Sequence, residues 1–170
     1  MVSYSTLHEP LLSNGWTLFA HPLLLDQLDN LNAQVDALRQ KDPVGYTRKN
    51  ATKRLAAVYK LLFDAIPQDP TRQEYRQGDT LGDEHKHWFR AKFFQQCRLF
   101  FRHDIASRII VFAWVKDEGS KRAYGSADDA YRTFRRMLKN GKPPDDWDNL
   151  LIEAKLANET RLLTVATRDS

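Results

Sequence analysis

Cysteine is nearly absent from this chain of 170 residues, where Cys97 stands alone. An internal disulfide is therefore excluded, which suits a reducing compartment. The sequence also lacks a His-x-x-x-His pair, a Cys-x-x-Cys pair and a Gly-x-x-x-x-Gly-Lys phosphate loop. These absences argue against the common zinc and nucleotide sites, so the sequence predicts no metal and no cofactor.

Long apolar stretches and an N-terminal positive charge are missing as well. The longest apolar run, Ile109–Val115, is far shorter than the roughly 20 residues that a membrane-spanning helix needs. The first basic residue is Arg39, whereas a secretory signal opens with positive charge. We therefore expect a soluble, cytoplasmic protein, and its 42% hydrophobic content is enough for one buried core.

Basic side chains are also absent from the first 38 residues, which carry four acidic ones. Because the whole chain has a net charge of +4, the remaining residues carry +8. A basic body of this size favours a polyanionic partner, either nucleic acid or an acidic protein.

Hydrophobic periodicity divides the chain into a loose arm over residues 1–13, a single domain over 14–157 and a frayed tail over 158–170. Apolar residues three and four apart predict helices, and alternation predicts strands. The expected helices span residues 24–40, 47–65, 126–139 and 145–157, and the expected strands span 15–20, 87–94, 97–103 and 108–115. This order predicts an α+β domain, in which helices pack on a small, twisted, mainly antiparallel sheet.

The segment over residues 86–102 holds six aromatic and five basic residues but no acidic one. The basic residues are Lys86, Arg90, Lys92, Arg98 and Arg102. Cations bind phosphates and aromatic rings stack on unpaired bases, so this composition favours single-stranded RNA. The alternative is a solvated strand face whose charges only keep the protein soluble.

Alternation along the expected strands sorts these side chains by face. Trp88, Arg90 and Lys92 share one face of the first strand, opposite to apolar residues that can pack on helices. Arg98 and Arg102 share one face of the second strand. If the two polar faces coincide, the sheet displays a group of cations beside an aromatic ring.

Short blocks spread over residues 14–147 share their order and spacing with a known family. They are Asn14-Gly15-Trp16, Ala20-His21-Pro22, Lys41-Asp42-Pro43, Arg48-Lys49, Ala51-Thr52-Lys53, Trp88-x-Arg90-x-Lys92-Phe93, Arg98-Leu99-Phe100-Phe101-Arg102, Trp114, Asp117-Glu118, Tyr124-Gly125, Asp129-Ala130-Tyr131, Met137-Leu138-Lys139 and Gly141-x-Pro143-Pro144-x-x-Trp147. In this combination the chain resembles the YhaV toxin family, a branch of the RelE-like, ribosome-associated RNA endonucleases.

The resemblance implies a RelE-like fold and a toxin of a type II toxin–antitoxin pair, which cuts mRNA and arrests growth. It implies a cognate antitoxin that resembles PrlF, and a toxin–antitoxin complex that binds operator DNA and represses its own operon. It also implies cleavage without a metal, in which the RNA 2′-OH attacks the adjacent phosphate and a 5′-hydroxyl leaves. Such a reaction needs positive charge around the phosphate and proton transfer at both ends.

The resemblance further assigns four catalytic positions, Arg90, Lys92, Arg98 and Tyr124. Arg90 would hold the phosphate, Lys92 would transfer a proton or stabilise charge, and Arg98 would clamp the scissile phosphate. Tyr124 would stack on a base or transfer a proton. Further RNA contacts are expected from Lys86, Trp88, Arg102, Lys121 and Arg122. The turn before Arg98 lacks the glycine that is common in the family, which leaves the strand register at Arg98 open.

Other functional readings of the same residues stay open. His85 and His87 adjoin the basic strand and suggest a histidine acid–base mechanism, although regular alternation turns His87 away from Arg90. A non-catalytic translation inhibitor or operon co-repressor would use the same basic sheet, but only an enzyme yields RNA fragments. A repressor that binds DNA alone lacks support, because no helix-turn-helix accompanies the basic third helix. That helix carries Arg132, Arg135, Arg136 and Lys139, which suit a solvated face or a contact with RNA or antitoxin.

Several further residues have structural interpretations. His21, in Ala-His-Pro, is typical of a turn. Asp145, Asp146 and Asp148 follow a Pro-Pro pair and are interpreted as charges at a helix N-terminus. The leucine stripe over residues 24–40 is predicted to pack on the sheet, with an antitoxin groove as the alternative.

Overall fold

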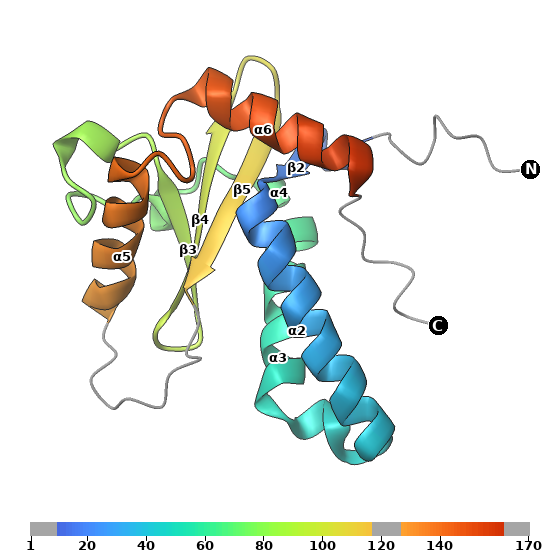
Figure 1. The fold of residues 1–170 in the computed structure, drawn as a ribbon. Coiled ribbons are helices and arrows are strands. Elements are labelled where there is room, and N and C mark those ends of the chain that lie inside the picture. The colour runs from blue at the N-terminus through green and yellow to red at the C-terminus, as the bar shows by residue number, and fades with distance from the viewer. Residues whose placement is uncertain (1–9, 117–126, 162–170) are drawn as a thin grey trace, which may run out of the picture.

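The computed structural model describes residues 10–116 and 127–161, which build a five-stranded mixed sheet with helices around it (Figure 1). The strands are β1 (Leu11–Ser13), β2 (Trp16–Ala20), β3 (Phe89–Phe93), β4 (Cys97–Asp104) and β5 (Ile109–Lys116). Their order is β1-β2-β5-β4-β3, with β2 parallel to β5 and the other neighbours antiparallel. The α+β class and the antiparallel meander of β3, β4 and β5 are confirmed.

Helices pack on both faces of this sheet. The α-helices are α2 (Pro22–Lys41), α3 (Asn50–Lys60), α4 (Ile66–Gln68), α5 (Ala127–Lys139) and α6 (Trp147–Thr160). Helices α2 and α3 lie side by side on one face, whereas α5 and α6 pack on the other (Figure 1). Among the described residues, no helix combines the length and the apolar character needed to cross a membrane.

The face under α2 and α3 buries the larger core. His21 begins α2, because its Nδ1 accepts a hydrogen bond from the backbone N–H of Leu23 at 3.2 Å. The apolar side chains of α2 then recur at helical spacing and point toward the sheet. The buried ones are Leu24, Leu25, Leu28, Leu31 and Val35, and they share a cluster with Ala91, Phe93, Leu99 and Phe101 of β3 and β4. The turn role of His21 and the packing of the leucine stripe are thus confirmed.

The opposite face buries a second core under α5 and α6. Phe134 of α5 stacks on Phe100 with ring centroids 4.2 Å apart, and the edge of its ring meets Trp88 at 4.9 Å. Trp88 has no exposed surface, so the expectation that its ring is open to an RNA base is wrong. The alternation placed Trp88 on the correct face but did not show that α5 covers it.

Residues 11–13, which were expected to belong to a loose arm, form β1 instead. They pair with β2 through a turn at Asn14-Gly15, where φ is 52° and 83°. Positive φ at both central residues defines a type I′ turn, for which Asn-Gly is a preferred sequence. The turn signal was therefore present, although the strand before it is too short to show alternation.

The helix expected over residues 47–65 is interrupted. Helix α3 begins at Asn50, a π-helical turn occupies Leu61–Ala65, and α4 continues to Gln68. The prediction ended this helix before Pro67, but Pro67 lies in the first turn of α4. Because proline has no N–H, the helical structure continues through this position with one backbone hydrogen bond missing.

The last helix, α6, also differs from its expected bounds of 145–157. It begins at Trp147 and ends at Thr160. Arg161 follows it and forms ion pairs with Asp26 at 2.9 Å and Asp29 at 2.6 Å on α2. These contacts attach the C-terminal end of α6 to α2. The helix therefore includes residues 158–160, which were expected to belong to a frayed tail.

Candidate active site

The cationic side chains of β3 and β4 lie on the face of the sheet that α5 covers. The register places Lys92 opposite Arg98 and Arg90 opposite Phe100. Residues directly opposite each other in antiparallel strands point to the same side, so the two polar faces coincide. Phe94 adopts φ of 50° in the hairpin turn, the left-handed conformation that glycine usually provides. The register at Arg98, which the sequence left open, follows from this turn.

Arg90 and Arg98 are held inside the protein and converge on Tyr131 of α5. Their exposed fractions are 8% and 5%. The Nε of Arg90 donates to the Tyr131 hydroxyl at 2.7 Å, and the Nε of Arg98 donates to the same oxygen at 3.2 Å. The Nη1 of Arg90 donates to the Glu74 carbonyl at 2.7 Å. The Nη1 of Arg98 donates to two carbonyls of the hairpin at 2.9 and 3.2 Å.

Both buried guanidinium groups are held by neutral acceptors in the part of the chain that the structure describes. Within residues 10–116 and 127–161, neither guanidinium pairs with a carboxylate, and the Nη2 of each has no acceptor. Burying a charge without a counter-ion is costly, and a bound anion removes part of that cost. A phosphate group suits this role, because the planar guanidinium can donate two hydrogen bonds to its oxygens.

Tyr131 was not predicted as a site residue. Its spacing from Phe134 and Leu138 is that of an apolar helix face, and its ring packs in the core, with 6% exposure and an edge contact to Phe100 at 5.8 Å. Its hydroxyl nevertheless meets arginines that precede it by 41 and 33 residues. No periodic pattern encodes such a contact, so the sequence offered no signal for it.

Lys92 and Lys116 lie at the rim of this site. Lys92 is exposed on β3, and Lys116 is half-buried opposite Arg98 on β5. Lys116 pairs with Asp129 of α5 at 3.3 Å. Lys92 forms no ion pair within the part of the chain that the structure describes, so its ammonium group is open to a ligand.

Arg102 lies apart from the two converging arginines. It is four residues from Arg98 along β4, roughly 13 Å at the usual rise of a strand. Its Nη1 donates to the Asp145 carbonyl at 2.7 Å, and its guanidinium lies 5.8 Å from the Trp88 ring and 5.3 Å from the Trp147 ring. Burial lowers the pKa of Arg102 below its ordinary value. The face that carries all these cations is therefore divided into two clusters.

Lys86 has acidic partners that the segment 86–102 does not contain. Its Nζ lies 3.2 Å from a carboxylate oxygen of Asp79 and 3.4 Å from one of Asp83. The hydrogen bond and the charge of Asp79, with a smaller contribution from Asp83, raise the pKa of Lys86. The remaining predicted site residues, Lys121, Arg122 and Tyr124, lie outside the described residues.

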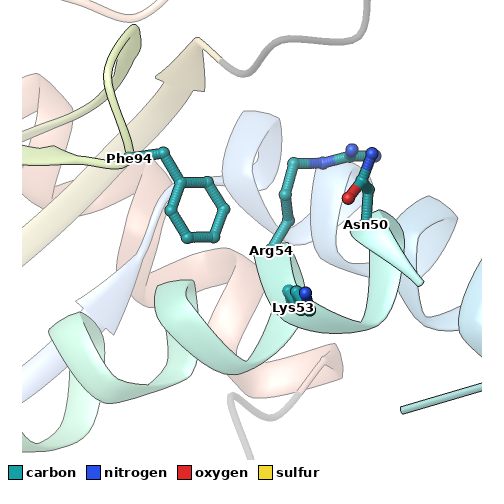
Figure 2. Close-up of a pocket in the computed structure, with 4 residues that line it drawn as sticks. All are labelled: Asn50, Lys53, Arg54 and Phe94. Carbon is teal, nitrogen blue, oxygen red and sulfur yellow. The ribbon is translucent and has the colours of Figure 1, made fainter. Parts of the chain in front are cut away.

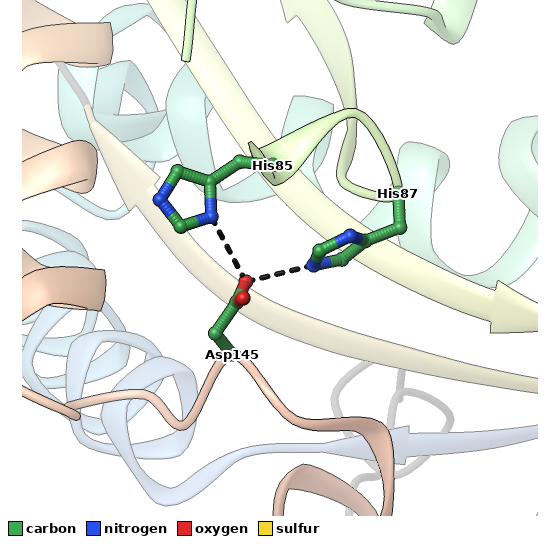
Figure 3. Close-up of side chains that lie close together, drawn as sticks. All are labelled: His85, His87 and Asp145. Atoms are coloured by element: carbon green, nitrogen blue, oxygen red, sulfur yellow. Dashed lines mark hydrogen bonds and ion pairs between the residues drawn. The ribbon is translucent and has the colours of Figure 1, made fainter. Parts of the chain in front are cut away.

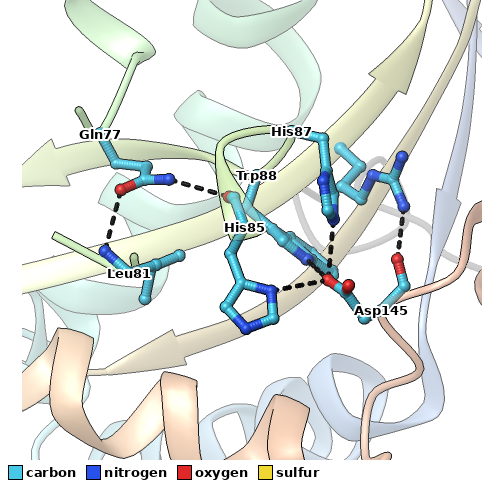
Figure 4. Close-up of polar contacts among 7 residues, drawn as sticks. Gln77, Leu81, His85, His87, Trp88 and Asp145 are labelled. Carbon is cyan, nitrogen blue, oxygen red and sulfur yellow. Dashed lines mark hydrogen bonds and ion pairs between the residues drawn. The ribbon is translucent and has the colours of Figure 1, made fainter. Parts of the chain in front are cut away.

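A second polar cluster joins the turn before β3 to the segment before α6 (Figure 3). The Nδ1 of His85 lies 3.1 Å from Oδ1 of Asp145, and the Nε2 of His87 lies 2.8 Å from the same oxygen. Trp88 donates its Nε1–H to this oxygen at 2.7 Å (Figure 4). Burial acts to raise the pKa of Asp145, but the hydrogen bonds from His87 and Trp88 and the nearby histidine charges outweigh it and lower the pKa.

This cluster corrects the interpretation of Asp145 as a helix N-terminal charge. Asp146 does cap α6, accepting from the N–H of Asn149 at 2.9 Å, and Asp148 lies in its first turn. Asp145 faces the two histidines instead. The sequence predicted no group that could hold a metal, yet His85, His87 and Asp145 offer three ligand atoms within 4.8 Å of one another. Sequence spacing could not show this, because Asp145 follows the histidines by about 60 residues.

A basic pocket of about 430 Å³ adjoins His85. It is lined by Glu84, His85, Arg132, Arg135, Arg136 and Lys139. The four cations belong to the exposed face of α5, and Glu84 is the one acid of the lining. A pocket with this charge balance favours an anionic ligand.

Comparison of the sequence with known proteins shows which family the chain belongs to. Residues 18–155 match a family described as a toxin with endonuclease activity, of a toxin–antitoxin system. This chain belongs to the YhaV toxin family. It is 44% identical over 144 residues to Toxin YhaV of Escherichia coli O6:H1, which covers 84% of this chain and 94% of the relative. It is 43% identical over 144 residues, with the same coverage, to Ribonuclease toxin YhaV of Escherichia coli K12.

No solved structure matches the chain. The membership in the YhaV family therefore rests on sequence, and the RelE-like assignment of its fold stays a prediction. The family match extends from β2 into α6, so it includes the converging arginines and the cluster of His85, His87 and Asp145.

One more pocket of this YhaV-family protein lies beside the tip of the β3–β4 hairpin (Figure 2). Its volume is about 320 Å³, and Asn50, Lys53 and Arg54 of α3 line it together with Phe94. Phe94 is 53% exposed, and its backbone adopts the left-handed conformation of the hairpin turn. The pocket thus combines an open ring, an amide and two cations.

Proposed function

We propose that this YhaV-family chain is an endoribonuclease toxin whose active site is the face of the sheet formed by Arg90, Lys92 and Arg98. The observation that carries this proposal is the convergence of two buried guanidinium groups on one hydroxyl, with no carboxylate partner among the described residues. The endonuclease activity of the family and the name of the K12 relative, a ribonuclease toxin, support RNA as the substrate.

In the proposed reaction the RNA 2′-oxygen attacks the adjacent phosphorus and the 5′-oxygen leaves. The products are a 2′,3′-cyclic phosphate and a 5′-hydroxyl, so atoms balance without a water molecule or a metal ion. Arg90 and Arg98 bind the phosphate through their Nη2 groups and stabilise the extra negative charge of the transition state. Their fixed geometry means that little reorganisation is needed when the charge develops.

Proton transfer requires groups closer to solvent than these two arginines. Lys92 lies across the β3–β4 ladder from Arg98 and is exposed, so it can reach an oxygen of the reacting phosphate. We assign it to proton transfer or charge stabilisation, and Tyr124 to base stacking or the second proton transfer. Lys121 and Arg122 add positive charge beside Tyr124 in this scheme.

Further cations extend the proposed RNA path. Lys86 and Arg102 contact the backbone beyond the scissile phosphate, where contacts set position rather than chemistry. At the hairpin tip, the exposed ring of Phe94 offers a stacking surface beside Lys53. Stacking on an aromatic ring and pairing with cations are the usual means of holding single-stranded RNA.

The partners follow from the toxin–antitoxin assignment. We propose that a cognate PrlF-like antitoxin neutralises the toxin, and that the complex of both binds operator DNA and represses the operon. The substrate is mRNA, on or off the ribosome, and the site of action is the cytoplasm. A basic toxin that binds an acidic polymer is well suited to an antitoxin that competes for the same positive charge.

The decisive experiment compares Lys92→Ala with Lys60→Ala. Both remove one exposed lysine, but Lys60 lies on α3, beyond the opposite face of the sheet. We expect induced wild type and Lys60→Ala to arrest growth and to produce new RNA 5′-hydroxyl ends. Lys92→Ala should lose about a hundredfold or more of the cleavage rate, the usual effect of losing a proton-transfer group. Arg90 is less suitable as a first variant, because it is buried and its loss also perturbs folding.

Other outcomes of this experiment would favour a different function or a different active site. Growth arrest without new ends in the wild type would contradict the nuclease and favour a non-catalytic inhibitor that uses the same basic face. Full cutting by Lys92→Ala, with loss in His87→Gln, would move the active site to the histidine cluster.

A further inference from the structure

We infer that His85, His87 and Asp145 form a binding site for a zinc-like divalent cation. The site lies outside the proposed nuclease centre, does not rest on the nuclease proposal and has no role in the cleavage steps above. Its donor set of two imidazoles and one carboxylate is one that zinc accepts readily in proteins. The three ligand atoms lie within 4.8 Å of one another.

The spacing of these atoms fits a metal as well as hydrogen bonds. In a tetrahedral zinc site with bonds of about 2.0–2.1 Å, ligand atoms lie about 3.3 Å apart. The nitrogen-to-oxygen separations of 3.1 Å for His85 and 2.8 Å for His87 are close to that value. The two ring nitrogens lie within 4.8 Å of each other, so rotation of the rings is the adjustment that would admit the ion (Figure 3).

The hydrogen-bonding pattern indicates that, without the ion, Oδ1 of Asp145 has more donors around it than it has acceptor directions. Oδ1 of Asp145 faces three ring nitrogens at once, those of His85, His87 and Trp88 (Figure 4). A carboxylate has about four acceptor directions shared between its two oxygens, so about two belong to each oxygen. A cation between the rings would replace both histidine contacts with coordination bonds. Trp88 would then remain as the outer donor that orients the carboxylate.

The surroundings also permit a cation. Arg102 lies close to the site, but it donates to the backbone carbonyl of Asp145 and not to the carboxylate. The carboxylate is half-buried, as is His87, and His85 is more deeply placed, with 13% of its side chain exposed. Three protein ligands leave a coordination position for water or an anion, and the basic pocket beside His85 would attract the latter.

Metal binding would link two segments that are distant in sequence. His85 and His87 precede β3, whereas Asp145 lies between α5 and α6. An ion held by both would fasten the start of α6 to the edge of the sheet. Because an ion that binds the folded state stabilises it by mass action, the thermal midpoint should rise with the metal concentration.

The test uses the full chain without a histidine tag, stripped with a chelator and titrated with Co²⁺ and then Zn²⁺. We expect one Co²⁺ per chain with visible d–d absorption, and displacement of Co²⁺ by Zn²⁺. A hundredfold excess of Zn²⁺ over its Kd should raise Tm by about 5 °C or more. Neither measurement needs RNA or cleavage, so its result is independent of the nuclease proposal.

The matched variants are Asp145→Asn and Asp146→Asn, which remove neighbouring carboxylates. Asparagine caps a helix as well as aspartate does, so Asp146→Asn keeps the α6 cap and should bind metal like the wild type. Asp145→Asn should lose at least tenfold in affinity and lose the Tm shift. His87→Gln should do the same, and its half-exposed side chain can be replaced without disturbing the core. Absence of stoichiometric binding in the wild type, or equal binding by both asparagine variants, would overturn the site.

Discussion

The hydroxyl of Tyr131 accepts hydrogen bonds from the Nε groups of both Arg90 and Arg98. A phenolic oxygen has two acceptor directions and one proton to donate. With both acceptor directions used, its own proton remains for another oxygen, and a phosphate bound between the arginines would supply one. At the scale of single residues, Tyr131 therefore both fixes the two cations and completes the proposed phosphate site.

Tyr131→Phe keeps the ring in the core and removes only this hydroxyl. Two buried Nε–H groups then lose their acceptor, which should lower the free energy of unfolding by about 1–3 kcal/mol. Urea unfolding measures this loss, and 5′-hydroxyl ends measure cleavage, which we expect to fall at least tenfold because both guanidinium groups lose their alignment. Tyr59→Phe is the control, since its hydroxyl accepts from Asn32 at 2.9 Å in the other core. Full cleavage by folded Tyr131→Phe would limit this hydroxyl to a structural role.

His103 gives the fold a dependence on pH. Its ring stacks on Phe89 with centroids 4.5 Å apart, and neither ring nitrogen has a partner among the described residues. Burial, with a contribution from the charge of Arg102, lowers the pKa of His103 below 6.5. The folded state thus favours the neutral ring. The contribution of His103 to the free energy of unfolding is fully present above pH 6.5 and is lost as the pH falls below that value.

We expect His103→Phe to reduce this acid sensitivity, because phenylalanine preserves the stacking and cannot be protonated. The free energy of unfolding should fall less between pH 7 and pH 5 than it does in the wild type, as followed by urea denaturation at each pH. His21 keeps a part of the effect, since burial also lowers its pKa. Parallel pH profiles for both proteins would show that His103 does not contribute.

Alternation in the sequence placed Arg90 and Lys92 on one face of β3 and Arg98 on one face of β4, because side chains alternate between the two faces along a strand. It could not find Tyr131 or Asp145, whose contacts depend on how α5 and the segment before α6 pack on the sheet. The sequence also overestimated the exposure of Trp88. A strand pattern indicates which face a ring occupies, but not whether a helix covers that face. The sequence thus did not reveal which side chains of this site are buried by elements that are distant in the chain.

At the scale of elements, β1 supplies a hydrogen bond that the helical segment before Pro67 lacks. Proline has no N–H, so the carbonyl of Phe63 lacks its usual helical donor four residues ahead. The hydroxyl of Ser13 on β1 donates to this carbonyl at 2.9 Å. The periodic pattern predicted both helices and the meander, but a strand of three residues and a single proline determine details that periodicity does not contain.

This contact can be tested by a double-mutant cycle on Ser13 and Pro67. Ser13→Ala should lower the free energy of unfolding by about 1–2 kcal/mol, because the Phe63 carbonyl loses its donor. In the Pro67→Ala protein the helix can supply its own N–H, so Ser13→Ala should cost less there. Urea unfolding of the four proteins gives the coupling between the two sites. Equal costs in both proteins would mean that Ser13 does not substitute for the missing helical donor.

At the scale of the whole molecule, several cations lie on the side of the sheet that carries α5. The converging arginines, Lys92, and the cations of the pocket beside His85 all belong to it. Binding that depends on such a surface releases counterions from RNA, so its affinity falls as salt rises. The sequence left three interpretations of the basic side of α5: a solvated face, contact with RNA or contact with the antitoxin. The structure places this side next to a pocket of suitable charge.

Arg135→Gln combined with Arg136→Gln distinguishes these interpretations. If both arginines contact RNA phosphates, the slope of log affinity against log salt should become shallower by about 1.4, the value for two contacts on a single strand. Binding of a single-stranded RNA is measured in the slowly cleaving Lys92→Ala protein, with Lys41→Gln and Lys60→Gln as the control pair on α2 and α3. An unchanged slope together with weaker antitoxin binding would assign the basic side of α5 to the antitoxin. The RNA path would then be confined to the arginine face and the hairpin tip.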